Sequence, residues 1–110
     1  MRKFPCWITR IVDGDTVDVV VDLGFKIHHK VRVRFDGYDA PEVRTKDKAE
    51  KARGVAAQRR LQALVQAMQS EEAYVELISN DIGKYGRVIG DVVIDGHSLV
   101  DAMIGWDKSK

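Results

Sequence analysis

The amino-acid sequence predicts an α+β fold that is mainly β, with one long helix near the middle of the chain and a short one near its end. Three observations predict this class. Apolar and polar residues alternate in five short segments, one longer segment has the apolar spacing of a helix, and turn-forming residues separate the segments. We expect residues 1–110 to form a single domain, because this length is typical of one and the chain has no internal repeat or low-complexity segment.

The first two segments are typical of a β-hairpin. Residues 7–12 are largely β-branched or aromatic, and Asp13-Gly14 after them is a common hairpin turn. Residues 16–23 then place four apolar side chains on one face: Val17, Val19, Val21 and Leu23. We therefore expect two antiparallel strands that bury one face and expose the other.

The third segment, residues 26–35, predicts a strand with one basic face. Its apolar positions are Val31, Val33 and Phe35, and the alternate positions are Lys30, Arg32 and Arg34. Residues 36–46 follow without an apolar period and contain Gly37 and Pro41. Because proline disfavours helix in the residue before it, we expect a loop here.

Residues from about 47 to 68 predict the long helix. Strong helix formers predominate, and one stripe has the spacing of a buried helix face: Ala57, Leu61, Leu64, Val65 and Met68. The basic residues in and just before this segment are Lys46, Lys48, Lys51, Arg53, Arg59 and Arg60. They form either a solvated face or a set of salt-sensitive contacts to a nucleic-acid backbone.

Two further strands and a short helix complete the pattern. Residues 72–78 and 88–94 alternate again, with a Gly83/Gly86 turn between them. Ser98, with Asp101 three residues later, resembles a capping box that opens a helix, which we expect to end at Gly105 before a frayed tail over residues 107–110. This order predicts a five-stranded barrel of the OB type with the long helix between strands 3 and 4; an open α+β sheet is the alternative.

Composition excludes several classes of protein. Hydrophobic residues make up 45% of the chain and charged residues 32%, as in an ordinary globular protein, and no segment approaches the ~20 apolar residues of a membrane helix. Without a signal peptide we expect a cytoplasmic protein with no membrane partner. The lone Cys6 forms no internal disulfide, and His28 and His29 face opposite sides of a strand, so no zinc site is expected.

The net charge of +1, from 18 basic and 17 acidic residues, is a weak signature for nucleic acid. Four short motifs are more informative than this balance, although each alone is typical of a turn or of surface charge. They are Asp13-Gly14-Asp15-Thr16, the pair Arg32 and Arg34, Asp39-Ala40-Pro41-Glu42, and Lys84-Tyr85-Gly86-Arg87.

Together these motifs supply the groups that phosphodiester hydrolysis needs. Asp15 and Asp39 offer two carboxylates to a hard cation such as Ca²⁺ or Mg²⁺. Arg34 and Arg87 are suited to clamp the phosphate oxygens that gain negative charge in the transition state. Glu42 is the candidate that orients or deprotonates the attacking water.

The motifs resemble those of the staphylococcal nuclease, or thermonuclease, family. The resemblance lies in D-G-D-T after a strand, an arginine five residues before D-A-P-E, and K-Y-G-R in a later hairpin, and it covers about residues 12–105. It implies that Asp15, Asp39 and the backbone carbonyl of Ala40 bind Ca²⁺, or Mg²⁺ or another divalent cation in its place. The implied catalytic residues are Arg34, Glu42 and Arg87, and those implied to hold a nucleotide phosphate are Lys84 and Tyr85. Family members cleave DNA and RNA, so these are the expected partners.

The sequence departs from the family pattern at two places. Ala40 replaces the threonine of the best-known member, which leaves a carbonyl ligand in place. Family domains also commonly continue beyond the position of Gly105 through a further strand and a last helix. We therefore expect an incomplete barrel whose exposed edge or apolar patch is covered by a second copy, as a homo-oligomer.

Two alternatives to a nuclease remain open from the sequence. The first is a non-catalytic OB-type module of the same fold that binds nucleic acid or protein. Such a module has no need to retain two metal aspartates, a glutamate and two arginines together, and this chain has all five, which favours the enzyme. The second is a subunit that becomes active only with a partner.

Overall fold

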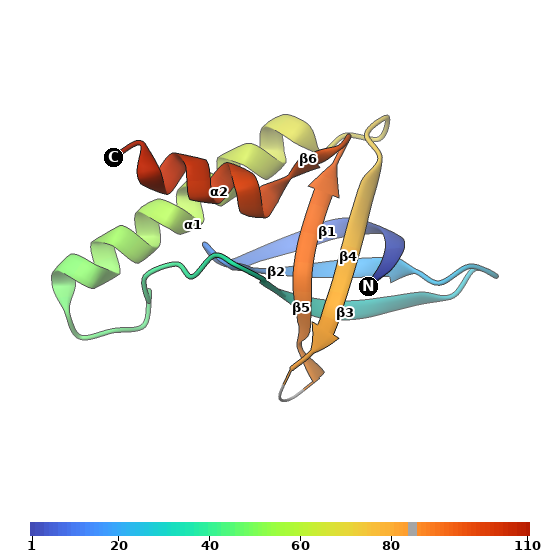
Figure 1. Ribbon diagram of the computed structural model, residues 1–110, viewed down its shortest axis with the longest axis horizontal. Helices are drawn as coiled ribbons and strands as arrows, with labels where there is room; N and C mark the ends of the chain where they lie inside the picture. The colour runs from blue at the N-terminus through green and yellow to red at the C-terminus, as the bar shows by residue number, and fades with distance from the viewer. Residues whose placement is uncertain (84–85) are drawn as a thin grey trace.

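The computed structural model describes residues 1–83 and 86–110, which form a closed β-barrel with two helices at one end (Figure 1). The strands are β1 (Arg2–Asp13), β2 (Thr16–Asp22), β3 (His28–Phe35), β4 (Val75–Ile82), β5 (Val88–Ile94) and β6 (His97–Ser98). The helices are α1 (Lys48–Met68), between β3 and β4 in the chain, and α2 (Leu99–Lys108). None of the helices in the described residues is both long and apolar enough to cross a membrane.

The barrel closes where β3 pairs with β5. The sheet order is β3-β2-β1-β4-β5-β6, and all neighbours are antiparallel. A parallel pairing of Val33 with Val88 and Phe35 with Gly90 joins β3 to β5. Five strands thus form a ring, which is consistent with an OB-type fold and excludes the open sheet. The expectation of an incomplete barrel was wrong, because β3 pairs with β5 of the same chain and closes the barrel. The homo-oligomer inferred from it remains a prediction.

Gly90 is the point on β5 where closure is tightest. A Cβ atom at this position would lie 1.9 Å from the carbonyl oxygen of Ile78 on β4. The carbonyl of Gly90 also accepts a hydrogen bond of 2.8 Å from the backbone N–H of Asp36, just after β3. The absence of a side chain therefore lets β5 contact β4 and the end of β3 together.

The barrel interior forms the core, and α1 covers one of its ends. The predicted inward residues Val17, Val19 and Val21 of β2 are all at most 3% exposed. On α1 the predicted stripe is buried at Ala57, Leu61 and Val65, with Leu64 and Met68 partly buried beside it. Just past the helix, the side chain of Gln69 accepts from the N–H of Ile8 (2.9 Å) and donates to its carbonyl (3.0 Å). This amide ties the end of α1 to β1.

The second helix begins as the sequence predicts and ends later. Ser98 is its N-cap, and the Ser98 hydroxyl accepts a hydrogen bond of 3.0 Å from the N–H of Asp101. The helix continues through Gly105 to Lys108, so the expectation that Gly105 ends it was wrong. The φ angle of Gly105 is not positive, unlike that of a glycine that terminates a helix. The tail is also held, because Nζ of Lys110 lies 3.5 Å from the ring centroid of Trp106.

Several predicted strand boundaries were wrong. β1 begins at Arg2, five residues early, because its start pairs with β4, and β4 runs over Val75–Ile82 instead of 72–78. β2 ends at Asp22 and β3 starts at His28, because Gly24, Phe25 and Lys26 all have positive φ. Leu23 is consequently 46% exposed, although the alternation predicted a buried side chain. The two-residue strand β6 is too short to show alternation.

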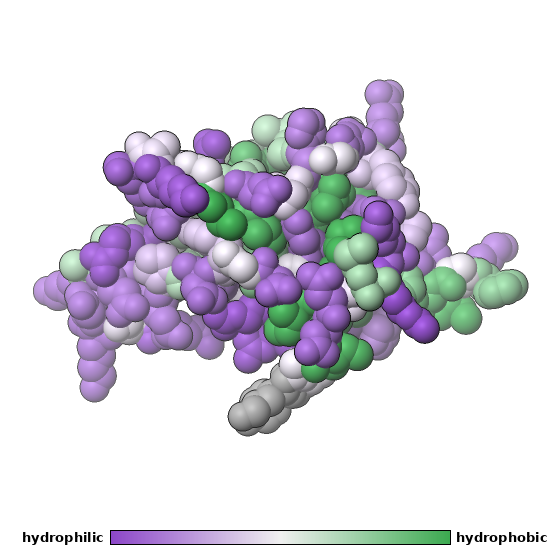
Figure 2. Space-filling model, viewed as in Figure 1, coloured by the Kyte–Doolittle hydropathy of each residue, from purple (hydrophilic) through white to green (hydrophobic). Residues whose placement is uncertain are grey.

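The loop between β2 and β3 projects from the barrel and carries apolar side chains. Phe25 is 97% exposed, and Leu23 and Ile27 beside it are about half exposed. Figure 2 shows hydrophobic surface gathered where this hairpin extends to the right. The tip lies at the opposite end of β3 from Arg34.

Two glycine substitutions test the account of barrel closure. Gly90→Ala places a methyl group onto the Ile78 carbonyl and is expected to lower the free energy of unfolding by about 2 kcal/mol or more. Gly105→Ala meets nothing within 4 Å in a helix and is expected to raise it by about 0.5–1 kcal/mol. Urea denaturation followed by circular dichroism measures both free energies of unfolding. Equal stability of the two variants would contradict the role of Gly90 in barrel closure.

Candidate active site

The predicted site residues converge on one pocket. Its volume is about 820 Å³, and it lies where the β1–β2 turn, β3, the loop after β3 and the start of β5 meet. Five of the predicted residues line it: Asp15, Arg34, Ala40, Glu42 and Arg87. A sixth, Asp39, does not line it but binds Arg34. The predicted residues Lys84 and Tyr85 lie outside the described residues.

Asp15 is the buried centre of the site. It is 6% exposed, its Oδ1 accepts a hydrogen bond from the Thr16 hydroxyl (2.9 Å), and its Oδ2 accepts one from the N–H of Ala40 (2.9 Å). The second bond joins the β1–β2 turn to a loop 25 residues later. Gly14 makes the approach feasible, because a Cβ there would lie 2.6 Å from that of Ala57 on α1 and 3.0 Å from that of Ala40.

Arg34 lies between the two predicted metal-binding aspartates. Its Nη2 is 2.7 Å from Oδ1 of Asp39 and 3.7 Å from Oδ2 of Asp15, so both carboxylates face one point. The hydrogen bond to Asp39 is the main cause that raises the pKa of Arg34, with partial burial acting against it. The Asp39 side chain is 83% exposed, so this ion pair contributes little stability and can open at small cost.

Glu42 is exposed on a loop that rests on the long helix. A Cβ at Gly54 of α1 would lie 2.7 Å from the carbonyl oxygen of Pro41 and 2.8 Å from that of Glu42. Glycine at this position therefore permits the loop backbone to contact the helix directly. Arg87, half-buried just before β5, lines the same pocket as Glu42 and Arg34. The carboxylate and the two guanidinium groups thus belong to one cavity.

The pocket contains ionisable residues that sequence reasoning did not assign to the site. Asp13 and Arg44 line it, as does Arg32, which alternation placed on the correct face of β3. The pKa of Asp13 is raised, first by burial and then by the negative charge of Asp15, while Arg44 acts in the opposite direction. Asp13 stands within a predicted motif, whereas Arg44 belongs to none and no sequence signal identifies it.

Positive charge predominates in this cavity despite the near-neutral chain. Its described lining carries three carboxylates, Asp13, Asp15 and Glu42, against five cations, Lys30, Arg32, Arg34, Arg44 and Arg87. Such a local excess attracts phosphate groups although acids elsewhere balance the total charge. The arrangement can therefore hold a polyanion.

The donor chemistry also fits a hard divalent cation. A positively charged group already lies between the carboxylates of Asp15 and Asp39, and carboxylate oxygens are the ligands that Ca²⁺ and Mg²⁺ prefer. Within residues 1–83 and 86–110 no three Asp, Glu, His or Cys side chains group as metal ligands. Two carboxylates facing one point would leave coordination positions to water and substrate.

Comparison with known proteins places the chain in a family. The model of the family described as "Staphylococcal nuclease homologue" matches residues 32–105, about two-thirds of the chain. The chain is also 34% identical, over 97 residues, to Protein ParB of Escherichia coli. That similarity covers 83% of this chain and 46% of ParB, so the chain spans about half the length of this curated relative. With Arg34, the Asp39–Glu42 loop and Arg87 all inside the matched span, the chain belongs to the staphylococcal nuclease homologue family.

Proposed function

We propose that this protein is a divalent-cation-dependent nuclease that hydrolyses phosphodiester bonds of DNA and RNA. The observation that carries the proposal is the convergence of Asp15 and Asp39 on Nη2 of Arg34, beside a pocket that also contains Glu42 and Arg87. Structural ion pairs alone would not require a further carboxylate and a further guanidinium in the same cavity. The family membership supports the same reaction class.

In this proposal the two arginines bind the phosphate at the scissile bond. Attack on phosphorus increases the negative charge on the non-bridging oxygens, and planar guanidinium groups donate paired hydrogen bonds to such oxygens. Arg34 projects from β3, and Arg87 immediately precedes β5, which pairs with β3. This pairing brings both guanidinium groups to one pocket, where they can act on the same phosphate.

Glu42 is proposed to hold the attacking water. It is exposed to solvent in the loop, with its backbone against Gly54, so it lies where water reaches the pocket. A carboxylate in hydrogen-bond contact with water orients one lone pair toward phosphorus and accepts the proton that leaves. The carboxylate and the arginines therefore have separate tasks, one on the nucleophile and the other on the phosphate.

Asp15, Asp39 and the backbone carbonyl of Ala40 are proposed to bind the cation, with Ca²⁺ preferred and Mg²⁺ the alternative. When bound, the cation supplies Lewis-acid polarisation of the phosphate and lowers the pKa of a bound water. Asp15 is held by hydrogen bonds from Thr16 and Ala40, so it forms the rigid half of the site. Asp39 is exposed and paired with Arg34; loss of that ion pair would leave the Arg34 guanidinium available to phosphate.

The proposed reaction predicts cation-dependent cleavage that depends on three side chains. Single-stranded DNA and RNA are expected to be cut with Ca²⁺ and left intact with chelator. Glu42→Gln, Arg34→Ala and Arg87→Ala are each expected to lower kcat/KM by a factor of about 100 or more, because each removes a transition-state interaction. Gel assays of oligonucleotide cleavage measure this, with Glu72→Gln, an exposed turn residue, as the control.

The alternative, binding without cleavage, gives a different result. A folded wild-type protein that retards oligonucleotides in a gel but cuts none with any divalent cation would be a binding module. That outcome would refute the nuclease proposal. Circular dichroism of each variant separates loss of function from loss of fold.

A second prediction concerns the loop that carries Glu42. Gly54→Ala adds a methyl group within 3 Å of the Pro41 and Glu42 backbone, so the loop must move. Misplacement of a catalytic group by about 1 Å lowers rates by a factor of about 100, so cleavage should fall about 10- to 100-fold while the helix persists. Gly105→Ala in α2 is the matched control, and wild-type cleavage rates in Gly54→Ala would show that the contact does not position Glu42.

A further inference from the structure

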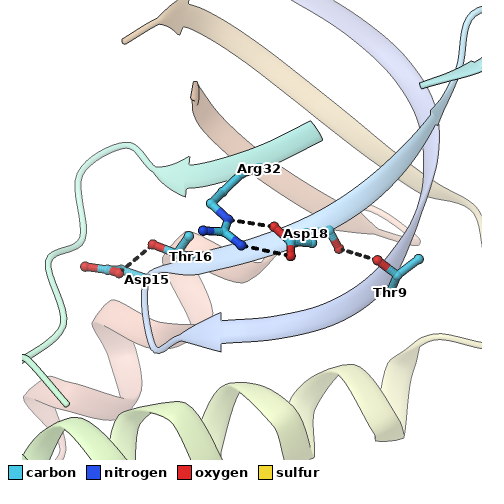
Figure 3. Close-up of polar contacts among 5 residues, drawn as sticks. All are labelled: Thr9, Asp15, Thr16, Asp18 and Arg32. Atoms are coloured by element: carbon cyan, nitrogen blue, oxygen red, sulfur yellow. Dashed lines mark hydrogen bonds and ion pairs between the residues drawn. The ribbon is translucent and has the colours of Figure 1, made fainter. Parts of the chain in front are cut away.

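The outward face of strands β1 to β3 continues from the candidate active site along the barrel. Strand register places side chains of this face in rows across the three strands. The row at the site contains Asp13, Thr16 and Arg34; the next contains Arg10, Asp18 and Arg32; the third contains Trp7, Val20 and Lys30. Figure 3 shows the middle of this surface, where the Arg32–Asp18 pair lies between Thr16 and Thr9.

Trp7 is an unusual residue for an open sheet face. It is 43% exposed, although its neighbours on either side, Cys6 and Ile8, turn toward the core. Part of this large aromatic ring therefore faces solvent. Such rings are the stacking platforms of proteins that bind single-stranded nucleic acid.

Two further hollows lie along this face beyond the active-site pocket. A hollow of about 470 Å³ adjoins the pocket and shares three lining residues with it, Lys30, Val31 and Arg32. A third, of about 380 Å³, lies farther along and is lined by Trp7, Val20 and His28 among others. Lys30 and Arg34 are four residues apart on β3, so the rows span roughly 13 Å. A linear ligand that leaves the pocket can follow this surface.

The charges along the path match a polyanion with spaced phosphates. Arg32 is held by Asp18 in a two-point contact of 2.8 and 3.2 Å, which fixes its guanidinium in one orientation. Arg10 and Lys30 are exposed on either side of this pair. Cations that flank an aromatic ring suit a strand whose phosphates and bases contact the protein alternately.

We propose that the outward face of β1, β2 and β3 is an extended subsite for single-stranded nucleic acid, in which Trp7 stacks on a base and Arg10 and Lys30 contact phosphates. The subsite begins beside the candidate active site and extends roughly 13 Å from Arg34 along β3. It rests on the proposed function in taking a nucleic-acid strand as the occupant. It adds a specificity element that predicts a preference for unpaired strands, because stacking on Trp7 requires a base that is not in a duplex.

Tryptophan fluorescence tests the subsite without cleavage. In the Trp106→Phe variant Trp7 is the remaining tryptophan, and a twelve-nucleotide oligothymidylate in chelator is expected to quench its emission. The Trp7→Phe variant retains only Trp106, which packs against the core and under Lys110, and is expected to show little quenching. Absence of quenching in the Trp106→Phe variant, or equal quenching by a duplex of the same length, would overturn the proposal.

Affinity and length dependence provide the second measurement. Trp7→Ala is expected to raise the Kd for the oligonucleotide about 10-fold, with Trp7→Phe retaining most of the affinity. Arg10→Ala is expected to reduce the slope of log Kd against log salt by about 1, whereas Lys108→Ala, which removes the same charge from α2, should not. In cleavage assays the wild-type protein is expected to have a lower KM for the longer strand than for a dinucleotide. In Trp7→Ala this difference in KM should be about 10-fold smaller.

The two proposals fail in different ways. If the wild-type protein and Trp7→Ala cleave the long strand with the same KM, the nuclease function stands and the subsite is refuted. Quenching of Trp7 by a strand that is never cleaved supports the subsite as a binding surface and refutes the nuclease function.

Discussion

The hydrogen bond from the Ala40 N–H to the Asp15 carboxylate is the interaction on which the candidate site depends. It joins a turn between two strands to a loop that has no regular structure of its own, and its acceptor Asp15 is buried, which limits competition from water. Two glycines make this junction feasible, because Gly14 lets the turn contact α1 and Gly54 lets the loop contact the same helix. The helix is therefore a support for the site, and the loop residues Asp39 and Glu42 are held by their backbone while their side chains remain in solvent.

The electrostatics of the molecule are local. The chain as a whole is nearly neutral, but the cavity gathers five cations around three carboxylates that lie close enough for the charge of Asp15 to raise the pKa of Asp13. Carboxylates near one another are unfavourable unless cations lie between them, and Arg34 partly fills this role. Burial first, and then the charge of Asp15, disfavours ionised Asp13. In the proposed function a divalent cation would take over part of the neutralisation that Arg34 provides.

The sequence predicted features that depend on local pattern and missed those that depend on register between distant strands. Alternation correctly placed Val33 and Phe35 inside and Arg32 and Arg34 outside, and the apolar stripe located α1 within a residue. The parallel contact of β3 with β5, which closes the barrel through Gly90, has no local signal, since it joins residues more than fifty positions apart. Predicted strand boundaries were also wrong. β1 starts early because it pairs with β4. β2 ends before Leu23 because Phe25 and Lys26 have positive φ. The order of the motifs predicted that Asp15, Arg34 and Glu42 share one site, whereas only the structure identified Arg44 and Trp7.

The parts of the proposed binding surface differ in rigidity, and this difference has consequences for catalysis. Trp7, Arg10, Arg32 and Arg34 all project from strands whose separation is fixed by backbone pairing in a closed ring. Glu42 and Asp39 stand on a loop held at a few contacts. Contacts to the rigid face bind a strand equally in the ground state and in the transition state, so by themselves they lower KM and not the barrier. In the proposed reaction they would help the chemical step, because a strand held at Trp7 and Arg10 would present a phosphate farther along the strand to Arg34, which leaves only the loop to adjust around the reacting phosphorus.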